Sequence, residues 1–175
     1  MEKLKNLTVV IVTYNTSEKI ILDCLDSIDK SVKTLIVENS ENFKHKNIVL
    51  SKFQNVEVLC TGSNLGMGSG NNYGLRHVKT DFALILNPDL TCEKGFFDNI
   101  PEIIDNHKNF SIIGCQYLYD KVFMPAGFFD EEKNSKFKDK FKNDNTDFLE
   151  KVDWVVGCSM LLNLKNFANR TIFDE

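Results

Sequence analysis

The run Leu7-Thr8-Val9-Val10-Ile11-Val12-Thr13 decides the fold, because nearly every residue in it is a strand former and apolar side chains fall on both faces. Such a strand is typical of the interior of a parallel sheet. Tyr14-Asn15-Thr16-Ser17 follows, and Ser17 is a favoured N-cap for a helix that begins at Glu18. The next apolar residues recur at helical spacing: Ile20, Ile21, Cys24, Leu25 and Ile28.

The same alternation of strand and helix continues along the chain. Further strands are predicted over 34–37, 56–60, 82–86 and 110–115. A helix is predicted from about 69–70 to Val78, and another within 94–107, where Pro101 favours a place in a first turn. This order predicts an α/β fold of one domain: a mostly parallel sheet with helices on both faces.

The last third of the chain differs in character. Residues 130–147 are dense in charged and amide side chains, which predicts a polar, mobile loop, with a lid as the sharper alternative. Residues 152–162 then return to a core-like strand.

Composition excludes several classes of protein. The 175 residues, 42% of them apolar, suit one globular domain. The net charge of −4 disfavours a nucleic-acid partner. The five cysteines form no CxxC pair and indicate buried thiols in a reducing compartment. The N-terminal apolar run is too short to span a membrane, and no small-residue cleavage site follows it. We expect a cytoplasmic protein, with contact at the inner face of the membrane left open.

Polar residues follow the predicted strands at Thr13-Tyr14-Asn15, Glu38-Asn39-Ser40, 61–64 and Asn87-Pro88-Asp89. Because parallel strands end at one edge of a sheet, these residues predict a ligand site there. The glycine-rich stretch 64–75 lacks both GxGxxG and GK[ST], so on spacing alone it is as consistent with a turn as with a ligand loop. Asp89 is a candidate ligand for a hard cation, although Asn-Pro-Asp alone is also a turn signal.

Taken together, six blocks resemble the family two inverting glycosyltransferases, particularly bacterial rhamnosyltransferase-like members. The blocks are residues 10–15, 35–40, 64–75, 84–89, 152–162 and the end segment Phe173-Asp174-Glu175. The resemblance implies a GT-A (Rossmann-like) fold, with a nucleotide-sugar-binding half over 1–116 and the start of an acceptor-side half over 117–175. It also implies a nucleotide-diphosphate sugar donor, from which a hexose or deoxyhexose moves with inversion to a glycan or lipid-linked acceptor in cell-surface polysaccharide synthesis.

The resemblance also implies roles for individual residues. Donor contacts would come from Thr13, Tyr14, Asn15, Glu38, Asn64, Gly66, Asn72 and Asn87, although the family usually has Asp where this chain has Glu38. Asp89 would hold Mn²⁺ or Mg²⁺ against the diphosphate. The acceptor side would include Trp154, Gly157 and Cys158.

The catalytic base of relatives belongs to an acidic pair that follows the Phe-Asp-Glu segment. The resemblance therefore places the base beyond Glu175 and implies that neither Asp174 nor Glu175 is catalytic. On that view the 175-residue form binds donor but transfers sugar poorly. The alternatives are a non-catalytic nucleotide-sugar-binding or interaction domain and, more weakly, a sugar nucleotidyltransferase, whose glycine-rich loop after the first strand is absent here. The sequence does not indicate an oligomeric state.

Overall fold

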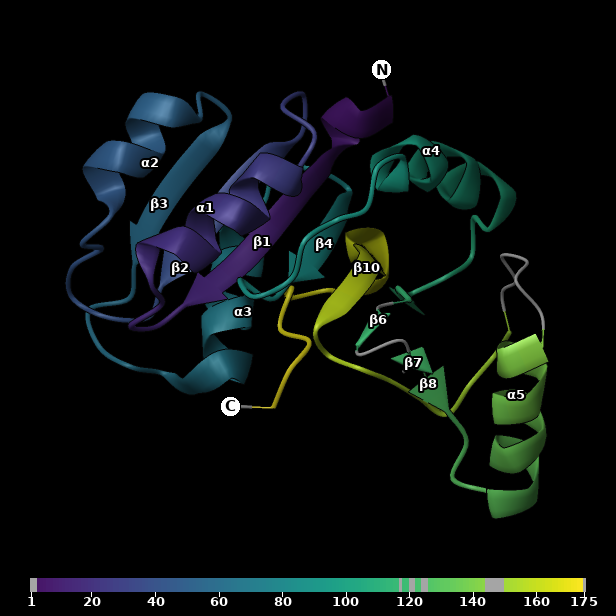
Figure 1. Cartoon of the computed structure of the whole chain (residues 1–175). Helices are drawn as coiled ribbons and strands as arrows, with labels where there is room; N and C mark the ends of the chain where they lie inside the picture. Colours follow the sequence, from purple (N-terminus) through teal and green to yellow (C-terminus); the bar gives the residue numbers. More distant parts are fainter. Residues whose placement is uncertain (1–2, 117, 120–121, 124–125, 144–149, 175) are drawn as a thin grey trace.

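The structure is a computed structural model that describes residues 3–116, 118–119, 122–123, 126–143 and 150–174 (Figure 1). The strands of its main sheet are β1 (Leu7–Thr13), β2 (Lys33–Glu38), β3 (Val56–Cys60), β4 (Phe82–Leu86), β5 (Ile112–Gly114) and β10 (Ser159–Asn163). The helices are α1 (Glu18–Ser27), α2 (Lys46–Lys52), α3 (Gly66–His77), α4 (Phe96–Asn106) and α5 (Glu131–Asn143), with short 3-10 turns at Lys3–Asn6 and Leu164–Asn166. Two short strand pairs complete the described elements: β6 (Leu118–Tyr119) with β7 (Val122–Phe123), and β8 (Ala126–Gly127) with β9 (Trp154–Val155).

The main sheet of the described residues has the strand order β3-β2-β1-β4-β10-β5. Strands β3, β2, β1 and β4 are parallel neighbours, whereas β10 is antiparallel to both β4 and β5. The prediction of a single α/β domain with a mostly parallel sheet is therefore confirmed. In β1, the register Thr13↔Glu38 brings the ends of β1 and β2 side by side.

Alternate residues of the strands pack into two apolar cores, one on each face of the sheet. Val9, Ile11, Leu84 and Leu86 pack with side chains of α1, α2 and α4 on one face. Val10, Leu35, Ala83 and Ile85 pack with α3 on the other. Figure 1 shows α1 and α2 on one side of the sheet and α3 on the opposite side. Burial on both faces explains why the strands contain so few polar residues.

Helix α3 approaches the sheet closely at Gly74. A Cβ atom at this position would lie 2.7 Å from Cγ1 of Val10 and 2.8 Å from Cγ2 of Val37. Both valines are fully buried, in β1 and β2. The missing side chain therefore lets the helix rest directly on two neighbouring strands.

Several predicted elements differ from the structure. Helix α3 begins at Gly66, earlier than predicted, and α2 was not anticipated. Pro101 lies inside α4 and not in its first turn. The predicted strand 152–162 is interrupted between β9 and β10. Cys60 is exposed, whereas buried thiols were expected.

The predicted polar loop over 130–147 is wrong for 131–143, which form α5; residues 144–149 lie outside the described residues. The cause is local. Oδ1 of Asp130 accepts a hydrogen bond from the Lys133 N–H at 2.8 Å and caps the helix. Lys136 pairs with Glu132 one turn away, and the Phe137 ring packs edge-to-face on Phe128, 5.5 Å between centroids.

Candidate functional site at the strand ends

A pocket of about 500 Å³ lies where β1 and β4 end, between the start of α1 and the first two turns of α3. Three of the predicted site residues line it: Asn15, Asn87 and Asp89. The other lining residues are Val12, Thr16, Ser17, Ile20, Met67, Asn71, Leu86 and Pro88. The pocket therefore lies at the carboxyl ends of parallel strands, where ligands of open α/β sheets bind.

The loop from β1 into α1 forms one wall of the pocket. Asn15 has a φ angle of 51°, a left-handed conformation that asparagine tolerates better than most residues. Ser17 occupies the N-cap position of α1 as predicted, but its side chain makes no capping hydrogen bond to the described residues. The neighbouring Tyr14 is half exposed. This wall therefore presents polar side chains to the pocket.

The Asn87-Pro88-Asp89 turn, which follows the neighbouring strand β4, forms another wall and is held by the strand beside it. The Asn87 N–H donates to the carbonyl of Cys158 at 2.8 Å, and the Asn87 carbonyl accepts from the Leu90 N–H at 3.2 Å. The Asp89 side chain is exposed to solvent. This anchoring places an exposed carboxylate at the rim of the pocket.

Two thiols near this turn are poor nucleophiles. Burial raises the pKa of Cys24 to about 12, with smaller contributions from Cys92 and the Asp89 carboxylate. Burial also raises the pKa of Cys158, and Asp89 again adds to the effect. Because the thiolate is the reactive form, these shifts disfavour a nucleophilic role for either cysteine.

Asn71 on α3 is a site residue that the sequence analysis missed. It lines the pocket, yet only 2% of the residue is exposed. Its buried Oδ1 has no hydrogen-bond partner among the residues that the structure describes. A buried polar atom without a partner is costly, and such atoms are uncommon in folded proteins. The available signal was its place in the glycine-rich stretch 64–75, which is as consistent with a ligand loop as with a turn.

Thr13 and Glu38 come together as predicted, but they are not among the residues that line the pocket. The Glu38 carboxylate accepts hydrogen bonds from Oγ1 of Thr13 at 2.7 Å and from Oγ of Ser40 at 2.6 Å. Glu38 is only 5% exposed, and neither it nor Thr13 lines the pocket. The network joins the ends of β1 and β2.

Asn39 organises the loop that leads into α3. Its Nδ2 donates to Oδ1 of Asn64 and to the carbonyl of Gly66, both at 3.0 Å. Its Oδ1 accepts from the Leu65 N–H at 3.1 Å and from Oγ1 of Thr61 at 3.2 Å. Asn64 and Gly66 thus form the loop beside the pocket, and Asn39 sets its shape.

We expect Asn39→Ala to loosen this loop. The substitution removes all four hydrogen bonds and leaves the Leu65 N–H without its side-chain acceptor. At roughly 1 kcal/mol for each net hydrogen bond, amide protection over 61–66 should fall by an order of magnitude or more. Hydrogen exchange measures this, with Asn55→Ala as the control, because the Asn55 side chain donates to the Val32 carbonyl at the other end of the sheet. Unchanged protection over 61–66 would contradict the assignment.

Asn72 was predicted to frame the pocket, but the structure brings it elsewhere. Its side chain is fully buried and bonds to the backbone of residues 172–173, and it is not among the residues that line the pocket. The consecutive helix residues Asn71 and Asn72 therefore face different parts of the molecule.

Of the predicted acceptor-side residues, Gly157 and Cys158 contact residues that line the pocket, whereas Trp154 packs in the β8–β9 pair. A Cβ atom on Gly157 would lie 3.9 Å from Cε of the pocket-lining Met67. The Cys158 carbonyl holds Asn87, as described above. Trp154 is 36% exposed, and its ring covers Gly127, where a Cβ atom would lie 2.4 Å from the ring.

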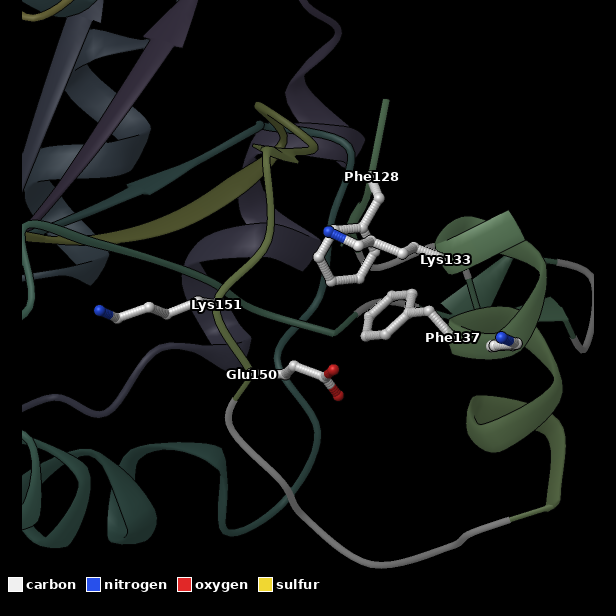
Figure 2. Close-up of a pocket in the computed structure, with 6 residues that line it drawn as sticks. Phe128, Lys133, Phe137, Glu150 and Lys151 are labelled. Atoms are coloured by element: carbon white, nitrogen blue, oxygen red, sulfur yellow. The ribbon is translucent and has the colours of Figure 1, made fainter. Parts of the chain in front are cut away.

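A second concavity, of about 370 Å³, lies between α5 and residues 150–151 (Figure 2). Phe128 and Phe137 form its apolar side, and Lys133, Lys136, Glu150 and Lys151 supply its charge. Figure 1 shows α5 standing away from the main sheet. This concavity is thus separate from the strand-end pocket.

The strand-end pocket fits a divalent cation only in part. Within the described ranges, no group of three His, Cys, Asp or Glu residues could enclose a metal. Asp89 is nevertheless an exposed carboxylate at the rim. Mg²⁺ is commonly held by one or two carboxylates together with substrate phosphates. The residues therefore fit a cation that is shared with a phosphorylated ligand.

The fold and site define an α/β domain with a ligand pocket at its strand ends. The family model "Glycosyl transferase family 2" matches residues 8–163. The chain belongs to this family, and its fold is GT-A.

Similar proteins include the low-salt glycan biosynthesis hexosyltransferase Agl10 of Haloferax volcanii, 29% identical over 66% of this chain and 38% of that protein. Among solved structures, S. aureus TarS in complex with UDP has a TM-score of 0.62 at 17% identity, over 94% of this chain and 52% of that one. The mannosyltransferase PcManGT from Pyrobaculum calidifontis, in complex with GDP-Man and Mn²⁺, has a TM-score of 0.56 at 13% identity, over 93% and 46%. The chain thus spans about half or less of these proteins. None of the described helices is long and apolar enough to cross a membrane.

Proposed function

We propose that the strand-end pocket binds a nucleotide-diphosphate sugar, and that the protein transfers its hexose or deoxyhexose with inversion to a glycan or lipid-linked acceptor. The observation that carries this proposal is Asn71, whose buried Oδ1 borders the pocket and has no partner in the described part of the chain. A sugar hydroxyl is a donor that would satisfy this oxygen. The hexosyltransferase role of Agl10 and the GDP-Man bound to PcManGT support this ligand class.

The remaining polar residues suit the parts of such a donor. Asn15 and Asn87 line the pocket from the loops that follow β1 and β4 and offer amide groups to the ligand. Thr13, Tyr14 and Glu38 lie at the ends of β1 and β2, toward which we place the base and ribose, with Asn64 and Gly66 in the adjoining loop. Asn72 acts outside the pocket. Trp154, Gly157 and Cys158 would border the acceptor.

Asp89 would hold Mn²⁺ or Mg²⁺ against the diphosphate. When bound, the cation would stabilise the charge that develops on the leaving diphosphate. The chain's own contribution is to fix this carboxylate at the rim, through the hydrogen bond between the Asn87 N–H and Cys158. PcManGT, whose structure contains Mn²⁺, supports the choice of cation.

Inversion is a direct displacement at the anomeric carbon and needs a carboxylate that takes the proton of the acceptor hydroxyl. We assign this role to no residue of the described part of the chain. The five free cysteines suit a reducing cytoplasm, and synthesis of cell-surface polysaccharide would place the protein at the inner face of the membrane.

We expect UDP, GDP or dTDP to bind in the presence of Mn²⁺. A ligand present at 100 times its dissociation constant stabilises a protein by about 2.7 kcal/mol, so the favoured nucleotide should raise the melting temperature clearly. Calorimetry on the same mixtures gives the dissociation constant. The matched control is the corresponding nucleoside with Mn²⁺, which lacks the diphosphate. If no nucleotide binds better than its nucleoside, the proposal fails.

A further inference from the structure

The segment 170–174 lies along α3 although it follows that helix by about a hundred residues. The link is Asn72. Its Oδ1 accepts the N–H of Ile172 at 2.9 Å and the N–H of Phe173 at 3.1 Å, and its Nδ2 donates to the Phe173 carbonyl at 2.8 Å. The side-chain amide of Asn72 thus hydrogen-bonds to two N–H groups and one carbonyl of this backbone.

Two further contacts fix the segment along the helix. At the end of α3, the Arg170 guanidinium donates to the Val78 carbonyl. In the first turn, a Cβ atom on Gly68 would lie 2.8 Å from the Asp174 carbonyl oxygen, so only glycine admits the chain there. Figure 1 shows the C-terminal segment beside α3. Met67, the residue before Gly68, lines the strand-end pocket, so the Asp174 backbone lies against the helix residue next to that lining.

Asn71 and Asn72, which are consecutive on α3, therefore make contacts of different kinds. Asn71 borders the pocket with an oxygen that no described residue satisfies. Asn72, one residue later and about 100° around the helix, has its amide hydrogen-bonded to the segment. The two contacts share one rigid element, which fixes the distance between the pocket and residues 172–174.

We propose that Asn72 is a positioning residue, which registers the backbone of 172–174, and with it Asp174, against the donor pocket without itself meeting the donor. The assignment rests on the proposed function for the identity of the ligand, but the registration itself does not depend on it. A glycosyl transfer needs the acceptor side placed to within a fraction of an ångström, because small displacements reduce rates steeply.

The first experiment compares Asn72→Ala with Asn71→Ala by hydrogen exchange and by calorimetry of a nucleotide-diphosphate sugar with Mn²⁺. We expect Asn72→Ala to lower the protection of the Ile172 and Phe173 amides by about tenfold or more, since both lose their acceptor, and to leave the nucleotide affinity unchanged. Asn71→Ala should do the reverse: unchanged amide protection and weaker binding of the sugar nucleotide. Gly68→Ala, which crowds the Asp174 carbonyl from the other side, should reproduce the loss of protection.

A second variant tests the hydrogen-bond geometry itself. Asn72→Asp keeps an acceptor for the two N–H groups but, when ionised, sets a carboxylate against the Phe173 carbonyl. When protonated, its hydroxyl can donate to that carbonyl in place of Nδ2. Burial raises the pKa of a carboxyl group. The protection factors of Ile172 and Phe173, relative to the parent, should therefore be near normal at about pH 5 and low at about pH 8.

A third experiment measures sugar transfer from a labelled nucleotide-diphosphate sugar to a glycan or lipid-linked acceptor. Asn72→Ala should lower kcat by about tenfold or more with an unchanged KM for the donor, because positioning and not donor binding is lost. Unchanged amide protection in Asn72→Ala would overturn the proposal, and so would an equal loss of protection and nucleotide affinity. If the parent binds no nucleotide at all, the proposed function fails, while the exchange data still decide the registration by Asn72.

Discussion

Asp89→Ala should remove the part of nucleotide-diphosphate affinity that depends on Mn²⁺. Loss of even an outer-shell partner of a metal ligand typically costs about 10–100-fold in metal affinity, so loss of the only carboxylate that lines the pocket among the described residues should cost at least as much. Calorimetry of UDP or GDP with and without Mn²⁺ measures the effect. The fold should be unaffected, because Asp89 is exposed and packs against no core.

Glu93→Ala is the matched control for Asp89→Ala. It removes an exposed carboxylate only four residues further along, outside the pocket lining. Parent-like Mn²⁺ dependence is expected there. If Asp89→Ala retains the full benefit of Mn²⁺, the cation is held by other groups and the role proposed for Asp89 is wrong.

Gly74→Val should cause the largest loss of stability of any single substitution considered for this chain. The first added carbon alone would lie 2.7 Å and 2.8 Å from methyl groups of Val10 and Val37. These are β-branched side chains with restricted rotamers in neighbouring strands, so they cannot turn away. Overpacking of this kind typically costs about 1–3 kcal/mol, and two further methyl groups bring the expected loss to about 3 kcal/mol or more.

Thermal unfolding of Gly74→Val should show a melting temperature lower by roughly 6–12 °C, on the usual scale for a domain of this size. Gly74→Ala adds the Cβ atom alone, so it compares the clash with helix propensity. Helix propensity by itself favours alanine by about 1 kcal/mol, so a lower melting temperature for this variant means that the clash dominates. Ser69→Ala, also on α3, reports propensity without a clash. A parent-like melting temperature for Gly74→Ala would mean that α3 can shift away from the sheet.

The sequence predicted the strands well because their signal is local. Runs such as 82–86 and 56–60 are short, mostly apolar and bounded by turn residues, as buried strands are, and the observed bounds agree. The convergence of Asn15, Asn87 and Asp89 was predictable for a related reason, since strand direction alone brings those loops to one edge.

The sequence could not show which side of α3 each asparagine faces. Asn71 and Asn72 are the same residue type in one glycine-rich run, and only packing directs one to the pocket and the other to residues 172–173. Helix α5 was missed for a different reason. Its many charged residues suggested a solvent-exposed loop. In the structure, Asp130 caps the helix and Phe137 is buried on one side of it, and both features favour a helix.

The position of β10 has a consequence for biosynthesis. This strand inserts between β4 and β5, although it is made about 45 residues after β5, an interval well above the usual length of loops. Until residues 159–163 leave the ribosome, the Phe82-Ala83-Leu84-Ile85-Leu86 edge of the nascent sheet has no partner on that side. Such an apolar open edge can pair with other chains, so it is the point at which a slowed or interrupted synthesis would lead to aggregation.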